Sequence, residues 1–369
     1  HQAGAIEAVI STGGQIMPPV MGAAAFIMAE VVGVPYSNVM KVALVPALLF
    51  FASLFFVVHL QAAKSGIEPF VRSTDDDEPF WRLLLNGGQF IIPFVTLIVM
   101  MLNGFSPFKA SYYSILVLLG CHVVWARRIG LDVFVKSAVA ITEGAKAVIP
   151  IAIACAAAGI IAGTLGITGL GSKISGLIVA ASGGYIFVAL ILTMLTAIIL
   201  GMGLPTTAAY LVLATVVAPA LAKMGLPLLT AHLFVFFYGC VSTITPPVAL
   251  ASYVAAGIAK ADINKVGWTA FIYGITCYIL PFMFVFGPGL MLSGPIPETG
   301  LAIASASLGV VAIAAAVIGY AKAPLSPLMR AVAAAAGLAL LHQGWMTDLV
   351  GLALACLVLA SGRAVLQKT

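Results

Sequence analysis

The sequence predicts an all-α polytopic membrane protein that contains two re-entrant helical hairpins. Hydrophobic residues make up 62% of the 369 residues, whereas roughly 45–50% is usual in a soluble domain. Charged residues make up only 8%, which is too few to cover the surface of a soluble protein of this size. A motif with two adjacent prolines also occurs twice within apolar sequence. This composition excludes a soluble enzyme, a nucleic-acid-binding protein and a disordered scaffold.

Apolar stretches of about 18 or more residues are long enough to cross the bilayer as helices. Such stretches are 38–62, 88–104, 108–126, 147–166, 184–202, 266–290 and 300–320, followed by 331–361 with an interruption at His342–Trp345. The charge-dense segment Lys64–Arg82 predicts a solvated loop and a short surface helix, although its acidic run Asp75–Glu78 leaves a metal site as an alternative. The bias of Lys and Arg toward cytoplasmic loops places residues 63–87 inside, but it does not decide the orientation of the C-terminal spans.

The two proline motifs resemble each other beyond their composition. Ser11–Val20 reads STGGQIMPPV and Cys240–Val248 reads CVSTITPPV, and an offset of 228 residues, from Pro18 to Pro246, aligns their proline pairs. A proline pair lacks two backbone donors and cannot continue a helix from the preceding residue. Each motif therefore predicts a helix, a break and a second helix within about 28 apolar residues, too few for two full spans.

A re-entrant hairpin fits this length. Non-helical backbone at membrane depth is tolerated only inside protein or beside a water-filled cavity. Broken helices at corresponding positions of two repeats are the best indication in a sequence of a transporter's binding site. The two hairpin tips are therefore the predicted site.

A third break precedes the second hairpin. In Gly201–Tyr210, which reads GMGLPTTAAY, Gly203 and Pro205 end one span. Thr206 and Thr207 then begin a half-helix that is expected to run to about Ala222. Half-helix N-termini suit anions, whereas unwound carbonyls and hydroxyls suit cations. A phosphate-binding loop is excluded because no Gly-Lys-Ser/Thr follows.

These three segments resemble the large membrane subunit of tripartite ATP-independent periplasmic (TRAP) transporters, over roughly residues 1–290. In the sequence of its first hairpin and in its extra spans beyond residue 300, the chain is most similar to fused 4TM/12TM permeases that work with TAXI-type binding proteins. The resemblance implies an inverted-repeat, elevator-type permease in a bacterial or archaeal cytoplasmic membrane. It implies import of a small organic anion, a carboxylate, driven by a cation gradient.

The resemblance also implies partners and site residues. The partners are a periplasmic TAXI-type solute-binding protein, small membrane-subunit helices that are fused or separate, and the lipid bilayer. No nucleic acid, no cofactor and no metal beyond a transported cation are expected. The implied substrate and ion ligands are Ser11, Thr12, Gly13, Gly14, Gln15, Pro18 and Pro19 in the first hairpin, and Gly203, Thr206, Thr207, Ser242, Thr243, Thr245, Pro246 and Pro247 in the broken helix and second hairpin.

The repeat also divides the chain. We expect the end of a first repeat at 1–62, a connecting loop and two spans at 63–130, a second repeat at 131–290 and extra spans at 291–369. A second repeat that begins near residue 131 places the start of the first repeat roughly a hundred positions before His1. The sequence therefore reads as a C-terminal fragment whose first repeat is N-terminally truncated.

The coupling ion is predicted to be Na⁺. No Asp or Glu lies between Glu143 and Asp262, whereas a proton-coupled site usually needs a titratable group inside the membrane. Carbonyl and hydroxyl oxygens of Gly203, Thr206, Ser242 and Thr245 suit Na⁺ without a fixed charge. Proton coupling stays open through Glu7, Glu30 and His232.

Three other functions remain as alternatives. A stand-alone elevator symporter for dicarboxylates would share both hairpins and need no binding protein. An intramembrane enzyme would place acidic pairs or an activated nucleophile at membrane depth, where residues 144–261 have no carboxylate. A channel would line a continuous polar pore.

Overall fold

The computed structural model describes residues 1–67, 80–126 and 131–366, and in these ranges the regular structure is helical apart from one isolated bridge between Tyr320 and Pro324. Six helical stretches are long and apolar enough to cross a membrane: Tyr36–Lys64, Pro107–Val124, Phe134–Ile167, Thr206–Lys223, Ile263–Phe286 and Ile296–Ile318. The predicted fold class, an all-α polytopic membrane protein, is confirmed. The acidic run at 75–78 lies outside the described residues.

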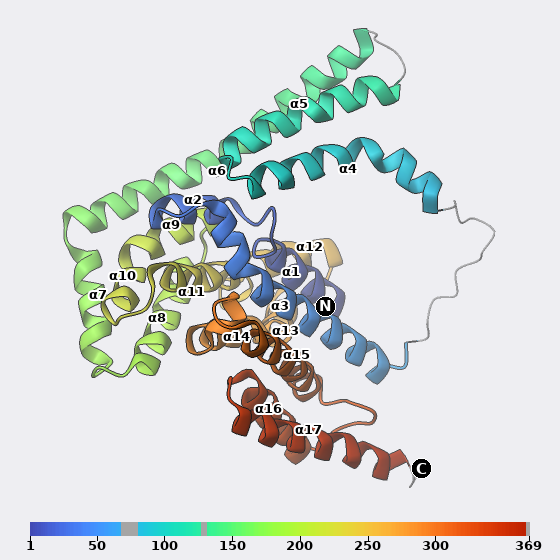
Figure 1. Cartoon of the computed structure of the whole chain (residues 1–369), viewed down its shortest axis with the longest axis vertical. Coiled ribbons are helices and arrows are strands. Elements are labelled where there is room, and N and C mark those ends of the chain that lie inside the picture. Colours follow the sequence, from blue (N-terminus) through green and yellow to red (C-terminus); the bar gives the residue numbers. More distant parts are fainter. Residues whose placement is uncertain (68–79, 127–130, 367–369) are drawn as a thin grey trace. The chain divides into compact units, whose positions relative to one another are not determined.

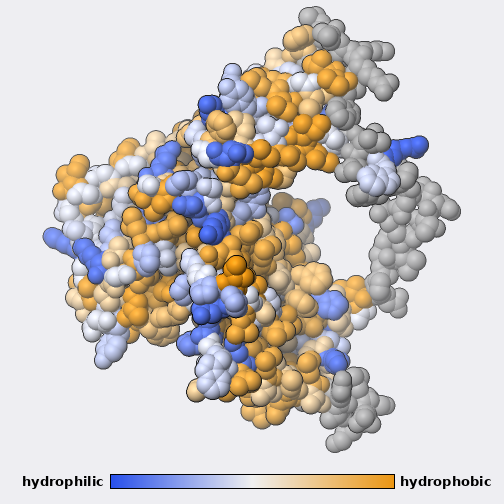
Figure 2. Space-filling model, in the orientation of Figure 1, coloured by the Kyte–Doolittle hydropathy of each residue, from blue (hydrophilic) through white to orange (hydrophobic). Residues whose placement is uncertain are grey.

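Apolar side chains cover large areas of the visible surface (Figure 2). Phe108 is 75% exposed and Ile160 is 70% exposed, and both lie on span-length helices. A soluble protein rarely exposes large contiguous apolar patches. Lipid accounts for this surface, because hydrocarbon removes the cost of exposing such residues.

The chain divides into two compact units. One contains His1–Val32, Val39–Ile67 and Cys155–Thr369, and the other contains Gly33–Asn38 and Glu68–Ala154. In the second unit, α4 (Phe80–Leu102) packs along α5 (Pro107–Ala126), and the Ser114 hydroxyl donates to the Pro93 carbonyl at 2.6 Å. The helix α6 (Leu131–Ile167) passes from this unit into the first.

Both predicted hairpins are present in the first unit (Figure 1). The first consists of α1 (Gln2–Gly14) and α2 (Ala23–Val32) and leads into α3 (Tyr36–Lys64). The second consists of α11 (Leu228–Val241), the short 3₁₀ helix η2 (Ser242–Ile244) and α12 (Leu250–Ala259), and leads into α13 (Ile263–Tyr273) and α14 (Ile275–Phe286). The offset of 228 residues brings the helix starts into register within about two residues.

The turns of the two hairpins follow the same backbone path. Each proline pair has a cis peptide bond. Met21 and Ala249, which the offset aligns, both have positive φ angles, of 54° and 29°. The N–H of Met21 donates to the Met17 carbonyl at 3.1 Å, and the N–H of Ala249 donates to the Thr245 carbonyl at 3.1 Å. The repeat in the sequence is therefore a repeat in structure.

The third break lies where it is predicted. The helix α8 (Ile186–Gly201) ends before Gly203, whose φ of +81° suits glycine, and α9 (Thr206–Val216) begins at Thr206. The half-helix does not continue unbroken to Ala222. It is interrupted at Val217, and α10 (Ala218–Lys223) follows because Pro219 lacks the N–H that a continuous helix requires. The helix α7 (Leu170–Ala181) packs beside these elements.

The C-terminal region contains α15 (Ile296–Ile318), α16 (Pro327–Leu341) and α17 (Trp345–Leu366), preceded by a 3₁₀ turn, η3 (Pro288–Met291). The stretch 331–361 is thus two helices that pack against each other across a turn at 342–344. Arg330 at the start of α16 and Arg363 at the end of α17 therefore lie at the same end of a helical hairpin. Both can satisfy the Lys/Arg rule at once, which a single span does not allow.

Candidate functional site

The two hairpin tips meet at a pair of threonines. Thr12, in the last turns of α1, is 1% exposed, and Thr243, in η2, is 8% exposed. Their Oγ1 atoms are 3.4 Å apart, although 231 positions separate them in the sequence. The packing of α1 against α11, α12, α13 and η2 produces this approach.

Backbone carbonyls take the hydrogens of both hydroxyls. Thr12 Oγ1 donates to the Ala8 carbonyl at 2.8 Å, and Thr243 Oγ1 donates to the Cys240 carbonyl at 2.7 Å. A hydroxyl has one hydrogen and two acceptor lone pairs. The two oxygens therefore face each other as acceptors, an arrangement that a cation between them would stabilise.

The other hydroxyls of the second tip are arranged in the same way. Ser242 Oγ donates to the Gly239 carbonyl at 2.8 Å, and Thr245 Oγ1 donates to the Val241 carbonyl at 2.6 Å. The Tyr278 hydroxyl lies 2.5 Å from Thr245 Oγ1. All three hydroxyl-bearing residues of this tip are buried. The tip is thus a small group of oriented oxygens inside an apolar protein.

The broken helix packs directly against the second tip. A Cβ at Gly201, the last residue of α8, would lie 2.8 Å from Ser242 Oγ and 3.1 Å from Ser242 Cβ. A Cβ at Gly203 would lie 3.7 Å from a methyl carbon of Val248. The absence of a side chain at residue 201 therefore allows the end of α8 to approach the Ser242 hydroxyl.

The predicted site residues differ in their burial and in their hydrogen-bond partners. Thr206 is buried and Thr207 half-buried at the start of α9, but within the described residues no hydrogen bond joins either to a hairpin tip. Ser11 is exposed, and its hydroxyl donates to a Glu7 carboxylate oxygen at 3.1 Å. Gly13 lies under the Phe50 ring.

The remaining predicted residues form the rims of the two turns. Gly14 is exposed with open space around its Cβ position, and the carbonyl of the half-buried Gln15 accepts from the N–H of Gly22 at 2.8 Å. The proline pairs lie at the rims of their tips, where Pro18, Pro19 and Pro246 are half-buried and Pro247 is exposed. Of the first hairpin's predicted side chains, that of Thr12 reaches the second tip, with its Oγ1 3.4 Å from Thr243 Oγ1.

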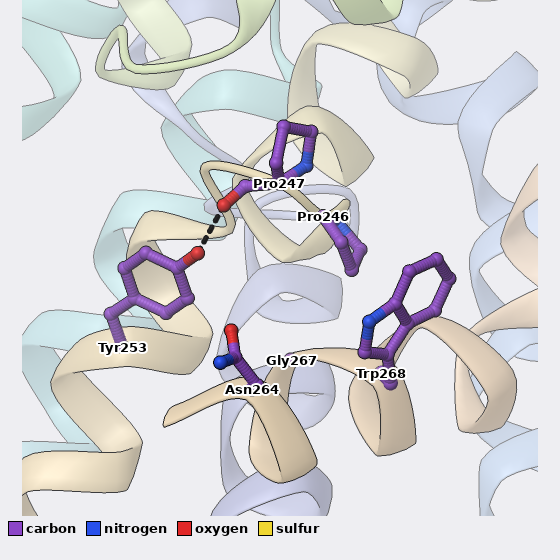
Figure 3. Close-up of a pocket in the computed structure, with 6 residues that line it drawn as sticks. All are labelled: Pro246, Pro247, Tyr253, Asn264, Gly267 and Trp268. Atoms are coloured by element: carbon purple, nitrogen blue, oxygen red, sulfur yellow. Dashed lines mark hydrogen bonds between the residues drawn. The ribbon is translucent and has the colours of Figure 1, made fainter. Parts of the chain in front are cut away.

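A cavity of about 210 Å³ adjoins the second tip (Figure 3). Its lining combines the proline pair with polar and aromatic groups of α12 and α13: Pro246, Pro247, Tyr253, Asn264, Gly267 and Trp268. The Tyr253 hydroxyl donates to the Pro247 carbonyl and so ties α12 to the turn. The Asn264 amide projects toward the same space (Figure 3), which gives the cavity donors for a small polar ligand.

The sequence reasoning missed Tyr253, Asn264 and Trp268. The polar break at 262–265 after the second hairpin is the signal that could have indicated Asn264. The other two are ordinary aromatic residues in apolar helices, and only the packing of α12 against α13 places them around one cavity.

Within the described residues, neither His232 nor a carboxylate is hydrogen-bonded to this oxygen cluster. His232 is buried on α11, and its Nδ1 lies 2.8 Å from the Tyr210 hydroxyl of α9. Glu7 and Glu30 are exposed. The described part of the chain has no group of three or more His, Cys, Asp or Glu residues that could hold a metal ion.

Residues 1–299 match the family described as the DctM component of tripartite ATP-independent periplasmic transporters. The chain belongs to this family. DctM proteins are transporter subunits that work with a periplasmic solute-binding protein and a small membrane subunit, so this chain is a TRAP permease component and a membrane protein. No curated protein matches the chain.

The matched residues end within the first turn of α15. The hairpins, the broken helix and the cavity all lie inside the DctM region, whereas α16 and α17 lie beyond it. The TRAP resemblance of the sequence is therefore confirmed.

Proposed function

We propose that this DctM component imports a small organic anion, a carboxylate, together with Na⁺, and that a periplasmic TAXI-type solute-binding protein delivers the substrate. The observation that carries the proposal is the buried Thr12–Thr243 oxygen pair between the two hairpin tips.

The geometry of this pair suits a cation of the size of Na⁺. Two oxygens that bind one ion at a right angle, each about 2.4 Å from it as in Ca²⁺ sites, stand about 3.4 Å apart. The distance between the two threonine oxygens is 3.4 Å, and Na⁺ has nearly the radius of Ca²⁺. Ser242, which precedes Thr243 in the second tip, and Gly201, whose Cβ position lies 2.8 Å from Ser242 Oγ, are candidates for further oxygen ligands.

Neutral oxygens favour Na⁺ over a proton. The hydroxyls at the tips do not titrate in the physiological range, and residues 144–261 contain no carboxylate. The nearby Glu7 and Glu30 are exposed, as expected of charges at the membrane surface. Proton coupling through His232 is the alternative, and uptake that does not respond to Na⁺ would support it.

The substrate belongs beside the second hairpin in this proposal. The cavity lined by Asn264, Trp268 and Tyr253 has side-chain N–H donors for a carboxylate and is large enough for only a small molecule. A substrate there would contact Pro246 and Pro247. These prolines belong to the same hairpin tip whose hydroxyl oxygens hold the ion in this proposal. Ion binding would then order the turn that the substrate needs, which couples the two.

Alternating access would follow an elevator path. The two hairpins and the broken helix pack as neighbours in one compact unit. We infer that they move together and carry the ion and the substrate across, while other helices hold the membrane position.

Uptake by proteoliposomes tests the proposal. The permease would be reconstituted with its small membrane subunit, and uptake of labelled organic acids measured with the binding protein outside and either a Na⁺ or a proton gradient. The proposal expects Na⁺-driven uptake that stops without the binding protein and falls in Asn264→Ala. Uptake without the binding protein would support a stand-alone symporter, single-channel currents would support a channel, and proton-driven uptake without Na⁺ would overturn the ion assignment.

A further inference from the structure

A second cavity lies in the C-terminal region, away from the hairpin tips. It has a volume of about 380 Å³ and lies among α3, α15, α16 and α17. Its lining is almost wholly apolar, and its two basic members are His59 of α3 and Lys322, which follows α15.

Helix packing explains why the groove exists. A Cβ at Gly337 of α16 would lie 2.9 Å from the Gly309 carbonyl of α15, and a Cβ at Gly351 of α17 would lie 3.0 Å from the Ala336 carbonyl of α16. These glycines let α16 approach both neighbours closely. The helices α15 and α17 make few contacts with each other, so a groove remains between them with Ala333 of α16 in its lining.

Basic residues gather at one end of this groove. The Lys64 ammonium, at the end of α3, donates to the Ile318 carbonyl at 2.6 Å. Arg330 donates through Nε to the Ala316 carbonyl at 2.9 Å and through Nη2 to the Val317 carbonyl at 3.0 Å. These two side chains satisfy the last carbonyls of α15, which lack partners within the helix.

Lys322 is in a different situation. It follows α15, lines the cavity and is exposed, and within the described residues its ammonium has no hydrogen bond or ion pair. No Asp or Glu is among the lining residues. The other basic lining residue, His59, stacks on Phe55 and is exposed. The groove thus has an apolar interior and an unpaired cation at one end.

We propose that this groove binds an anionic phospholipid, with part of an acyl chain between α15 and α17 and the phosphate at Lys322 and His59. The Lys/Arg rule places this end on the cytoplasmic side, because Lys64, Lys322, Arg330 and Arg363 all belong to it. Anionic lipids are attracted to such basic clusters at the membrane surface. The proposal does not depend on the transport function, because the groove lies apart from both hairpin tips.

Native mass spectrometry of the full chain tests this proposal. The protein would be purified in detergent with equal amounts of phosphatidylglycerol and phosphatidylcholine, and the lipid that stays bound would be identified. We expect one retained phosphatidylglycerol in preference to phosphatidylcholine. Lys322→Gln should lower this preference about fivefold, the loss expected for one basic contact with an anionic headgroup. Lys173→Gln, which changes an exposed lysine on α7, should leave it unchanged.

Filling the groove gives an independent measurement. Ala312→Trp on α15 and Ala355→Trp on α17 should each abolish retention of both lipids, with circular dichroism melts used to verify folding. Equal retention of the two lipids, an equal loss in Lys322→Gln and Lys173→Gln, or retention in both folded tryptophan variants would overturn the proposal. Oleate that displaces phosphatidylglycerol at equal concentration would also overturn it and would indicate a free fatty acid as the occupant.

Discussion

The two hairpins have similar backbone turns but different side chains at their tips. Their proline pairs, their positive-φ residues Met21 and Ala249, and the hydrogen bond that each of these two residues donates across its turn correspond at an offset of 228 residues. The three hydroxyl-bearing residues of the second tip, Ser242, Thr243 and Thr245, align with residues that have no hydroxyl: Gly14, Gln15 and Met17.

This difference shows what the repeat preserves. Backbone geometry provides two broken elements that meet inside the protein, and the side chains then concentrate the oxygens on one of them. The first hairpin contributes one hydroxyl, Thr12, to the contact. The residues that line the cavity differ between the repeats in the same way. Tyr253, Asn264 and Trp268 of the second repeat align with Ala25, Tyr36 and Met40 of the first.

The largest effect is expected where the oxygen of the second tip is removed. Thr243→Val keeps the shape of the side chain but deletes one half of the oxygen pair. We expect Na⁺-driven uptake to fall by about 30-fold or more, the effect of losing one buried polar contact of roughly 2 kcal/mol. The matched control is Thr230→Val on α11, whose buried hydroxyl lies by the Met291 sulfur rather than at the tip. Equal losses in the two variants would contradict the assignment.

The next effect tests how the first hairpin is packed. A Cβ at Gly13 would lie 2.1 Å from Cε1 of the fully buried Phe50, whereas a Cβ at Gly14 has nothing within 4 Å. Gly13→Ala should lower the free energy of unfolding by about 1–3 kcal/mol through overpacking, and Gly14→Ala should not. Thermal melts in detergent measure both. Similar melting temperatures for the two variants would mean that the first tip is looser than described.

A smaller effect is expected at the aromatic support of the second hairpin. Tyr278→Phe removes the hydroxyl that lies 2.5 Å from Thr245 Oγ1. The expected loss is about 1 kcal/mol of stability, typical of one hydrogen bond. Tyr273→Phe is the control, since its hydroxyl has no hydrogen bond within the described residues and the residue is also buried. Chemical-denaturation curves that do not separate the two variants would count against a structural role for Tyr278.

The smallest effect concerns the aligned position in the first hairpin. Gly14→Ser places there the side chain that the second hairpin has at Ser242. Because the position is open and exposed, stability should change by less than about 0.5 kcal/mol, and Na⁺ dependence should stay within about twofold. A clear gain in Na⁺ affinity would show instead that the first tip also lies close to the ion.

The sequence predicted the features that depend on local backbone physics. Proline pairs and Gly203 break helices whatever surrounds them, so both hairpins and the start of α9 at Thr206 could be located. The start of α6 could not be located in this way. It begins at Leu131 rather than near 147, because a helix tolerates charges that lower the hydropathy, such as the Glu143–Lys146 pair at 2.8 Å.

Features that depend on tertiary packing could not be predicted from the sequence. Nothing in either motif indicates that Thr12, rather than Ser11 or Gln15, faces the second tip, since the orientation of α1 on α12 and α13 decides it. The same holds for the groove at Lys322, which exists only because α15 and α17 both pack on α16.

Direct binding of ²²Na⁺ to the purified chain tests the central claim most closely. Scintillation proximity measurements would compare the unchanged protein, Thr12→Val, Thr243→Val and the Thr12→Val/Thr243→Val double variant. If the two oxygens hold one ion, each single variant should lose most of the bound Na⁺, and the double variant should lose little more. Unchanged ²²Na⁺ binding in Thr243→Val would contradict the claim that the hairpin tips form the cation site.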